Sequence, residues 1–307
     1  MSTVDQLTVP VRADAPAAPV AGTYWRALLE LTKPGITRMV LVTTAAGFYL
    51  ASPGSVDWPL LAMTLVATAL VASASGALNQ WAEREADGRM VRTRRRPLPS
   101  GRLARTQALV FATLLGLAGL LVMALWVGPV PALLVGASLL TYVLVYTPLK
   151  RLTWWATIVG AFPGALPILA GWTAAGGGID AAGLVLFGIL FLWQMPHFYA
   201  LAWIYRDDYL RGGFRLLSAD DPTGIRTARQ AVLFAVLLLP VSLLPGVVGG
   251  SGVAYVAGAL ALGFVYVGLG VGLLMHRSSR RAWRLFFASV VYLPALLLLM
   301  VLDKAAV

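Results

Sequence analysis

The sequence contains no cysteine and very little charge. Without cysteine, the chain cannot form a disulfide, use a thiolate as a nucleophile, or bind zinc or an iron–sulfur cluster through sulfur. Only 12% of the 307 residues are charged, about half the share found in soluble globular proteins. In contrast, 59% are hydrophobic, and the mean hydropathy is +0.79. This composition argues against a soluble fold and indicates a protein embedded in a lipid bilayer.

Long stretches without Asp, Glu, Lys or Arg define the expected membrane spans. A transmembrane helix needs about 20 apolar residues. Two of the stretches, 106–149 and 230–276, are long enough for two spans each. Five others fit one span each: 39–56, 58–82, 152–179, 181–205 and 285–302. The sequence therefore predicts an all-α, multi-pass protein with nine transmembrane helices.

Almost nothing is left over for a second domain. Residues 28–307 are expected to form a single membrane domain. Residues 1–27 are rich in Pro and Ala and contain no apolar segment, so they are expected to be a disordered cytoplasmic tail.

The basic residues gather in alternate loops. The net charge of +11 is compatible with nucleic-acid binding, but the placement of the cations favours another explanation. All Lys and Arg residues except Lys304 lie before the first expected span or after the second, fourth, sixth and eighth. Cytoplasmic loops collect Lys and Arg. The pattern predicts a plasma (inner) membrane protein with a cytoplasmic N-terminus and an outside C-terminus, and no nucleic-acid partner.

Three oxygen-bearing side chains follow a helical spacing at the end of the expected second span. Asn79, Glu83 and Asp87 are four residues apart, so on a helix they share one face, about 6 Å per step. Two carboxylates and an amide oxygen are hard ligands suited to Mg²⁺, which usually shares its shell with phosphate oxygens and water. The alternative is an ordinary charged helix end exposed to solvent, but such an end has no need to gather these three side chains on one face. The spacing therefore predicts a magnesium site.

A crowded run of arginines follows directly in the sequence. Arginine forks bind phosphate oxygens bidentately, so Arg92 and Arg96 are expected to hold a diphosphate and stabilise it as a leaving group. The preference of cytoplasmic loops for cations explains some basic residues here, but not eight in one loop beside acids. Lys150, at the inner end of the fourth span, is either a third phosphate ligand or a lysine that reaches out to the interface.

Ionisable side chains also occur in and after the sixth expected span. His197 lies inside that span, where an ionisable residue is a candidate functional group by default. It is compatible with a metal or haem ligand, a proton carrier or a packed polar group. Asp208 is expected to hold a second cation or to orient Lys150. The second histidine, His276, lies at a membrane interface and is expected to be structural.

At these residues the chain resembles the UbiA superfamily of intramembrane prenyltransferases, and within it the branch that farnesylates haem. The resemblance covers about residues 27–303. It rests on the following motifs: Lys33-Pro34, Asn79-x-x-x-Glu83-x-x-x-Asp87, Arg92-Thr93-x-x-Arg96-Pro97-Leu98, Tyr146-x-x-x-Lys150-Arg151, Pro196-His197-Phe198 and Asp208-Tyr209-x-x-Gly212-Gly213. The first acidic motif identifies only the superfamily, whereas the arginine run together with Pro196-His197-Phe198 is more specific.

The resemblance implies a helical bundle around a central cavity, with an active site at the cytoplasmic face. It implies Mg²⁺ as cofactor and farnesyl diphosphate and haem B as substrates, with haem O as product and a haem A synthase as a possible partner. The catalytic residues are then expected to be Asn79, Glu83, Asp87, Arg92, Arg96 and Lys150, the first three also binding the metal. The expected substrate-binding residues are Lys33, Thr93, Tyr146, Arg151, His197, Asp208 and Tyr209.

The chain also departs from the superfamily pattern, and other functions are compatible with parts of it. Many members carry a second pair of Asp residues four apart, where this chain has Arg211 after Asp207 and Gly212 after Asp208. One alternative is a sister prenyltransferase that acts on a quinone or chlorophyll precursor. Another is a transporter, although transporters place ionisable groups near the middle of the membrane. A membrane scaffold or haem-delivery subunit is a third.

Overall fold

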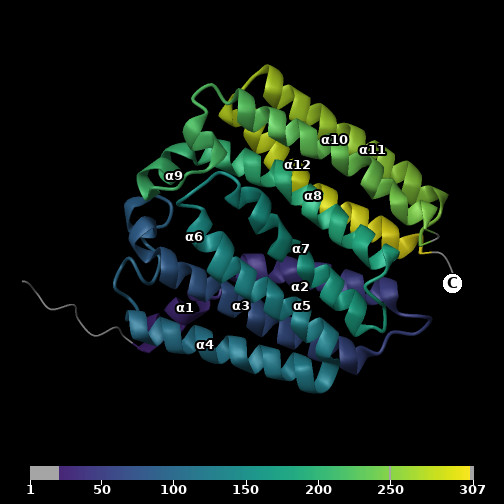
Figure 1. Ribbon diagram of the computed structural model, residues 1–307, viewed down its shortest axis with the longest axis horizontal. Helices are drawn as coiled ribbons and strands as arrows, with labels where there is room; N and C mark the ends of the chain where they lie inside the picture. The colour runs from purple at the N-terminus through teal and green to yellow at the C-terminus, as the bar shows by residue number, and fades with distance from the viewer. Residues whose placement is uncertain (1–20, 249, 305–307) are drawn as a thin grey trace, which may run out of the picture.

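The structure is a computed structural model that describes residues 21–248 and 250–304, and within these residues the chain forms a bundle of long helices (Figure 1). The helices are α1 (Ala21–Leu31), α2 (Pro34–Ala51), α3 (Trp58–Arg89), α4 (Arg105–Val122), α5 (Pro129–Leu140), α6 (Thr147–Leu149), α7 (Ala156–Ala174), α8 (Ala181–Ile204), α9 (Arg206–Gly212), α10 (Ile225–Val247), α11 (Val253–Met275) and α12 (Ser279–Leu302). Short π-helical segments, Met123–Val127 and Thr141–Tyr146, extend α4 and α5.

The predicted class is confirmed, but one of the nine expected spans is less apolar than the other eight. In the described residues, eight helices are long and apolar enough to cross a membrane. The helix at the first expected span, α2, is not among them. It has only 18 residues, and these include Arg38 and three threonines that lower its hydropathy. The chain is a multi-pass membrane protein of the all-α class.

The expected N-terminal tail also requires a correction. Residues 1–20 lie outside the described part of the chain, but residues 21–27 begin α1 rather than belonging to an unstructured tail. The helix forms because one of its faces is apolar. Ala27, Leu28 and Leu31 are buried against residues of α3 and α4.

The helices alternate in direction, which brings the connecting segments 90–104, 150–155, 205–224 and 276–278 to one end of the bundle (Figure 1). We call this the basic end, because these segments and the helix ends beside them carry most of the basic residues. Helix α3 has 32 residues and is therefore about 48 Å long, which exceeds the roughly 30 Å of a bilayer core. Its last turns reach beyond the apolar layer at the basic end.

Helix α7 packs between α2, α5 and α8, and it contains two prolines. Pro167 has no N–H, so the carbonyl of Pro163 loses its usual helical donor. Ser138 of α5 replaces that donor with a hydrogen bond of 2.7 Å from its Oγ. Gln194 of α8 donates a further hydrogen bond of 2.7 Å to the carbonyl of Ala161. Neighbouring helices thus satisfy the backbone of α7 where no water is present.

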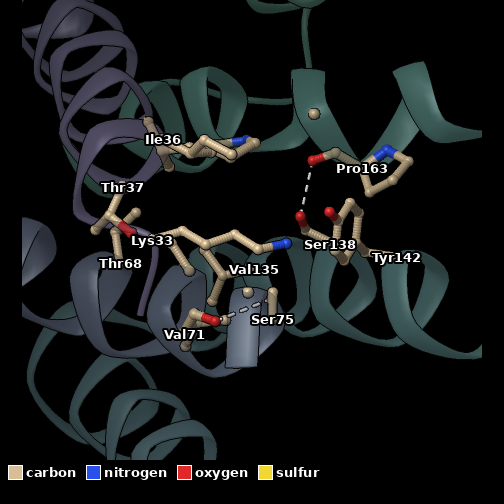
Figure 2. A pocket seen from close by; sticks show the side chains of 15 residues that line it. Lys33, Ile36, Thr37, Thr68, Val71, Ser75, Val135, Ser138, Tyr142 and Pro163 are labelled. Carbon is tan, nitrogen blue, oxygen red and sulfur yellow. Dashed lines mark hydrogen bonds between the residues drawn. The ribbon is translucent and has the colours of Figure 1, made fainter. Parts of the chain in front are cut away.

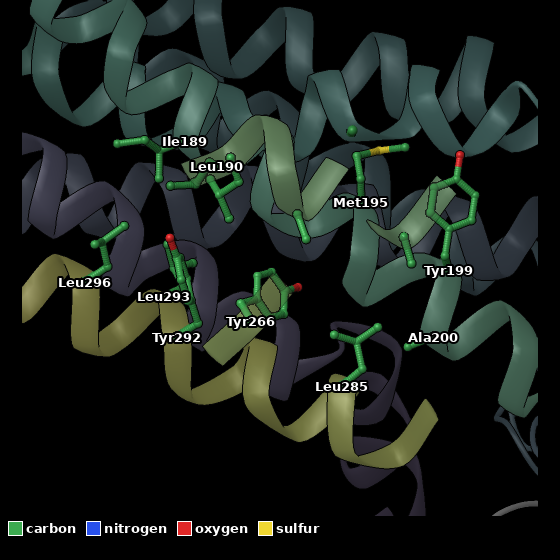
Figure 3. Packing of buried hydrophobic residues seen from close by; sticks show 14 of the residues in the cluster. Ile189, Leu190, Met195, Tyr199, Ala200, Tyr266, Leu285, Tyr292, Leu293 and Leu296 are labelled. Atoms are coloured by element: carbon green, nitrogen blue, oxygen red, sulfur yellow. The ribbon is translucent and has the colours of Figure 1, made fainter. Parts of the chain in front are cut away.

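The largest buried cluster lies on the α8–α12 side of the bundle. Figure 3 shows Tyr266 of α11 and Tyr292 of α12 beside one another, with ring centroids 5.0 Å apart. On the other side of α7, contact with α2 depends on glycine. A Cβ on Gly171 would collide with the carbonyl of Thr44, and a Cβ on Gly47 would collide with that of Ile168. Small residues let these two helices approach closely.

At the end of the bundle opposite the basic end, the segment after α12 returns to α2. The Lys304 Nζ donates to the carbonyls of Tyr49, at 3.0 Å, and Ser52, at 2.7 Å. The backbone N–H of Gly252, just before α11, donates to the carbonyl of Asp303 at 3.0 Å. We call this group of bonds the far-end clasp. It joins the ends of α2 and α12 and the turn between α10 and α11.

Candidate active site

The predicted face of α3 exists and is buried. Asn79, Glu83 and Asp87 are 2%, 4% and 1% exposed, although all three are polar. The helix has passed its most apolar part here, so its last turns can carry charge. Buried carboxylates need compensating partners, and the surrounding segments supply them.

Each of these three side chains meets one cation from a different segment. The pairs are Lys33 with Asn79, Lys150 with Glu83, and Arg96 with Asp87. The Lys33 Nζ donates to the Asn79 Oδ1 at 2.6 Å, and the Arg96 guanidinium donates to both oxygens of Asp87 at 2.9 and 2.8 Å. We call these six residues the pairing cluster. The arrangement assembles three cations from distant parts of the sequence along one helix face.

The Lys33 side chain is held in place by an unusual backbone. Lys33, between α1 and α2, has a φ of 51°, which makes it the one non-glycine residue with positive φ in the described chain. A left-handed conformation costs about 1–3 kcal/mol at such a residue. Burial, together with the nearby charges of Arg96 and Lys150, lowers the pKa of Lys33 to about 7, against the opposing effects of Glu83 and Asp87. The left-handed backbone at Lys33 thus accompanies an ammonium group that is bonded to Asn79.

Lys150 is enclosed by aromatic rings. Its Nζ lies 4.7 Å from the ring centroid of Tyr146 and 5.1 Å from that of Phe214. The π-helical segment 141–146 precedes it, and such segments are frequent at functional sites. Gly160 of α7 leaves room for the Tyr146 ring, since a Cβ there would lie 2.5 Å from two ring atoms. The ammonium group is thereby directed at α3 and not at the interface.

Asp208 organises the arginine segment after α3. Its carboxylate accepts hydrogen bonds from the backbone N–H groups of Val91, at 3.0 Å, and Arg92, at 3.2 Å. The guanidinium of Arg211 donates to it at 2.6 Å. Burial raises the pKa of Asp208, but these hydrogen bonds and the Arg211 charge outweigh burial, so the net pKa lies below its usual value. Among the described residues, Asp208 bonds to the 90–92 backbone and to Arg211 and not to Lys150.

Replacing Asp208 with asparagine is expected to destabilise the fold at neutral pH. Because the folded pKa is lowered, the ionised carboxylate stabilises the protein above its unfolded pKa of about 4, and this contribution is lost as the pH falls through the folded value. We expect a loss of about 1.5–3 kcal/mol at pH 7 that shrinks below about pH 4. Thermal unfolding in detergent between pH 7 and pH 3 measures it.

Asp207→Asn is the matched control. Its carboxylate is 70% exposed and lies 3.4 Å from Arg206, so its loss should leave the unfolding temperature nearly unchanged. An equal effect of both substitutions would mean that the bonds to the 90–92 backbone contribute nothing.

A cavity adjoins the pairing cluster (Figure 2). It encloses about 120 Å³ between α2, α3, α5 and α7. Its lining is mostly apolar: Ile36, Val40, Val71, Ala72, Val135, Pro163 and Pro167 contribute, together with Lys33, Ser75, Ser138 and Tyr142. Figure 2 shows the Lys33 amine pointing along this cavity toward Ser138 and Tyr142. The cavity thus has a mostly apolar lining, with the ammonium group of Lys33 on the side of the pairing cluster.

The other predicted site residues occupy several places. Thr93 donates from its Oγ1 to the Asp87 carbonyl at 2.9 Å and so supports the pairing cluster. The Arg92 guanidinium lies over Tyr205, 4.9 Å from its centroid, and 5.9 Å from that of Tyr209. Arg151 is exposed and forms no ion pair with any described residue. His197 lies apart from the cluster, on α8 against α12.

Two neighbours of the site were not predicted. Thr147 accepts a hydrogen bond of 3.2 Å from the Asn79 amide, which orients that side chain. Phe214 covers Lys150. Thr147 lies inside the Tyr146–Arg151 motif, three residues before Lys150, and this placement could have marked it as a neighbour of the site. Phe214 follows Gly212-Gly213, and only the folded turn after α9 brings it near.

The donor set at α3 fits a hard divalent cation. Among the described residues, no three His, Asp or Glu side chains come together in one group. The candidate ligands are instead two carboxylates and an amide oxygen on successive turns of one buried helix face. Such oxygens suit Mg²⁺ when phosphate oxygens complete the shell. The pairing cluster has cations on these same oxygens, so it can exchange partners when an anionic ligand arrives.

Comparison with known proteins identifies the family. Residues 40–291 match the model of the UbiA prenyltransferase family. The protoheme IX farnesyltransferase of Solibacter usitatus is 45% identical over 91% of this chain and 99% of that protein. The enzyme of the same name from Salinibacter ruber is 42% identical over 90% and 97%.

Solved structures show the same fold at low identity. A structure of digeranylgeranylglyceryl phosphate synthase aligns with a TM-score of 0.77 at 17% identity, over 91% of this chain and 98% of that one. A UbiA homolog from Archaeoglobus fulgidus bound to GPP and Mg²⁺ aligns with a TM-score of 0.66 at 12% identity, over 89% and 99%. The resemblance found in the sequence is confirmed, and the chain belongs to the UbiA prenyltransferase family.

Proposed function

We propose that this protein transfers the farnesyl group of farnesyl diphosphate to a vinyl group of haem B, with addition of water, and so produces haem O. The observation that carries the proposal is the pairing cluster at the mouth of an apolar cavity. The acceptor is inferred from the relatives at 42–45% identity, all named protoheme IX farnesyltransferase. The more distant structures support the fold alone.

The cations of the pairing cluster bind the diphosphate. Lys33, Lys150 and Arg96 converge on one face of α3. When a diphosphate enters, they can turn from the α3 oxygens to phosphate oxygens. They then stabilise the negative charge that develops on the leaving group as the allylic C–O bond breaks.

The freed α3 oxygens would provide the metal site. Asn79, Glu83 and Asp87 would hold Mg²⁺, which supplies Lewis-acid neutralisation of the diphosphate. Thr147 and Thr93 keep Asn79 and Asp87 in position through their hydrogen bonds. Arg92 and Arg151 are the remaining proposed ligands for the anionic substrate, at the outer rim of the site.

The cavity receives the prenyl chain. Its apolar lining would exclude water from the allylic carbon, and Tyr142 is part of that lining. The Tyr146 ring lies 5.2 Å from the Tyr142 ring and contacts Lys150. Aromatic faces stabilise a positive carbon through cation–π attraction. A vinyl group of the acceptor then attacks the allylic cation, and water adds to the resulting benzylic-type cation. No nucleophilic side chain is required, in agreement with a chain that has no cysteine.

A turnover assay tests the function. Purified protein in nanodiscs is incubated with haem B, farnesyl diphosphate and Mg²⁺, and products are followed by mass. We expect an adduct of haem, farnesyl and water that is absent without Mg²⁺. Prenylation of an aromatic quinone precursor, with no haem adduct, would assign the chain to a sister function, and transport without any product would contradict enzyme activity altogether.

The proposed orientation follows from the charge pattern. The basic end, with the active site, faces the cytoplasm, and the far-end clasp faces the outside of the plasma (inner) membrane. A haem A synthase is a proposed partner, because haem O is a substrate for further oxidation. Cysteine labelling at Lys304 and Arg94 in intact cells tests the orientation: only Arg94→Cys should be protected from an impermeant reagent added outside the cell.

A further inference from the structure

A second polar site lies away from the pairing cluster, between α8 and α12. His197 of α8 and Ser289 of α12 share a hydrogen bond of 2.7 Å between Nδ1 and Oγ. Trp193, one turn earlier on α8, donates from its Nε1 to the Ser289 carbonyl at 2.8 Å. Ser289 is fully buried. This is a built arrangement of polar groups within membrane-spanning helices, and the transfer reaction described above does not use it.

The hydrogen bonds determine which nitrogen of His197 carries the proton. The Ser289 hydroxyl donates to the carbonyl of Phe286 at 2.5 Å, so its hydrogen is already engaged. With that hydrogen engaged, the Ser289 Oγ is assigned as the acceptor from His197, and Nδ1 as the protonated nitrogen. Neutral imidazole then has its lone pair on Nε2. Within the described residues, Nε2 has no hydrogen-bond partner.

Aromatic rings frame the imidazole. The ring centroids of Trp193, Phe198 and Phe286 lie 5.6, 5.7 and 4.8 Å from that of His197. The row of rings extends from Phe286 toward the basic end. The Trp283 ring centroid lies 5.4 Å from that of Phe286 and 6.2 Å from that of Tyr205. His197, Trp193 and Phe286 are each partly exposed and not sealed in the core. The imidazole is thus partly exposed among aromatic rings, the kind of side chain against which a flat ligand stacks.

We propose that His197 Nε2 is an axial ligand of the iron of the acceptor haem, and that Ser289 is the positioning residue that fixes its tautomer and direction. This inference rests on the proposed function and adds to it the place where the acceptor binds. Neutral imidazole is a common axial ligand of haem, and metal-binding histidines almost always donate their other N–H to a fixed acceptor. Ser289 supplies that acceptor here.

The depth of His197 in α8 is compatible with transfer at the basic end. Seven residues separate it from the last residue of α8, Ile204, which corresponds to about 10 Å along the axis. Tyr205, which follows, lies under the guanidinium of Arg92. A haem held by His197 would therefore lie close to the end of α8 that faces the arginine segment.

Haem-binding spectra provide the test. Ferric haem B alone, without prenyl diphosphate, is titrated into the full-length protein in nanodiscs and followed by optical absorption and electron paramagnetic resonance. The wild type should give the spectrum of histidine-ligated ferric haem. His197→Asn, which can still bond to Ser289 through its amide, should lose that spectrum and bind haem at least about tenfold more weakly. External imidazole should restore the spectrum in His197→Gly.

The chain offers an unusually clean control, because it contains only one other histidine. His276 is exposed in the turn between α11 and α12, and His276→Ala should bind haem with the wild-type spectrum. Ser289→Ala should shift the spectrum and weaken binding about tenfold. Ser289→Thr, which keeps the hydroxyl, should restore both. A purely structural role for Ser289 would change thermal stability but not the spectrum of the haem that remains bound.

The possible outcomes separate this inference from the proposed function. A wild-type spectrum in His197→Asn overturns the ligand assignment, even if haem farnesylation proceeds normally. Histidine ligation that disappears only in His276→Ala overturns it as well. If the ligation depends on His197 but the wild type makes no farnesylated haem, the ligand assignment is supported and the proposed reaction is wrong.

Discussion

Replacing Asp87 with asparagine is expected to reduce the turnover number for prenyl transfer by about a thousandfold. Asp87 is 1% exposed and binds Arg96 through both oxygens. Asparagine preserves its size but removes the charge that would hold Mg²⁺ and that balances the guanidinium. The interaction gains strength as charge develops on the leaving group, so the turnover number should fall more than the affinity for the diphosphate. Single-turnover kinetics with mass detection measure the two separately.

Glu85→Gln is the matched control for Asp87→Asn. It removes a carboxylate from the same turn of α3, but Glu85 is exposed and pairs only with its neighbour Arg84 at 2.7 Å. Turnover should stay within about twofold of the wild type, as is usual for exposed ion pairs. If Asp87→Asn also stays within about tenfold of the wild type, the α3 face is not the metal site.

The second large effect concerns stability. Gly171→Ala should destabilise the protein by about 1–3 kcal/mol or more, because overpacking in a dense interior cannot be relieved cheaply. The added Cβ would collide with the carbonyl oxygen of Thr44 and would lie 3.1 Å from the backbone nitrogen of Phe48. These are backbone atoms of α2, so no side chain can rotate away. Thermal unfolding in detergent and the monodisperse fraction after purification measure the loss.

Gly268→Ala gives the opposite expectation. Gly268 lies in α11, and a Cβ there would meet no atom within 4 Å. Replacing a helical glycine by alanine without a clash should stabilise by up to about 1 kcal/mol. The sign of the effect thus separates close helix contact from helix propensity. Equal melting temperatures for the two variants would refute the close approach of α2 and α7.

The α3 face could be predicted because its information is local. Asn79, Glu83 and Asp87 repeat every four residues on one helix, and charge that persists at the end of an apolar helix is conspicuous. The cations that pair with this face could not be identified in the same way. Arg92 and Arg96 look alike in the sequence, but the turn after α3 directs only Arg96 to Asp87, whereas Arg92 covers Tyr205. That separation depends on contacts with α9, more than 100 residues away.

The predictions for the first membrane span and for the end of the N-terminal tail differ from the structure for physical reasons of the same kind. Helix α2 is short and contains Arg38 and threonines, so its membrane character depends on the helices beside it rather than on its own hydropathy. Helix α1 was hidden by the Pro and Ala composition of the segment before it, although the spacing of Ala27, Leu28 and Leu31 gives it an apolar face of its own. The role of Ser289 was likewise hidden, because a single serine in an apolar stretch has no meaning until its histidine is opposite.

The far-end clasp has a consequence for how the protein is made. Lys304 follows every described helix in the chain, but its ammonium group reaches the end of α2, across 252 and 255 residues of sequence. During synthesis, α2 leaves the ribosome long before Lys304 does. Contacts of such high sequence separation form late. The carbonyls of Tyr49 and Ser52 therefore lack this partner until translation has passed α12, and a short and weakly apolar helix has to wait in or beside the bilayer until then.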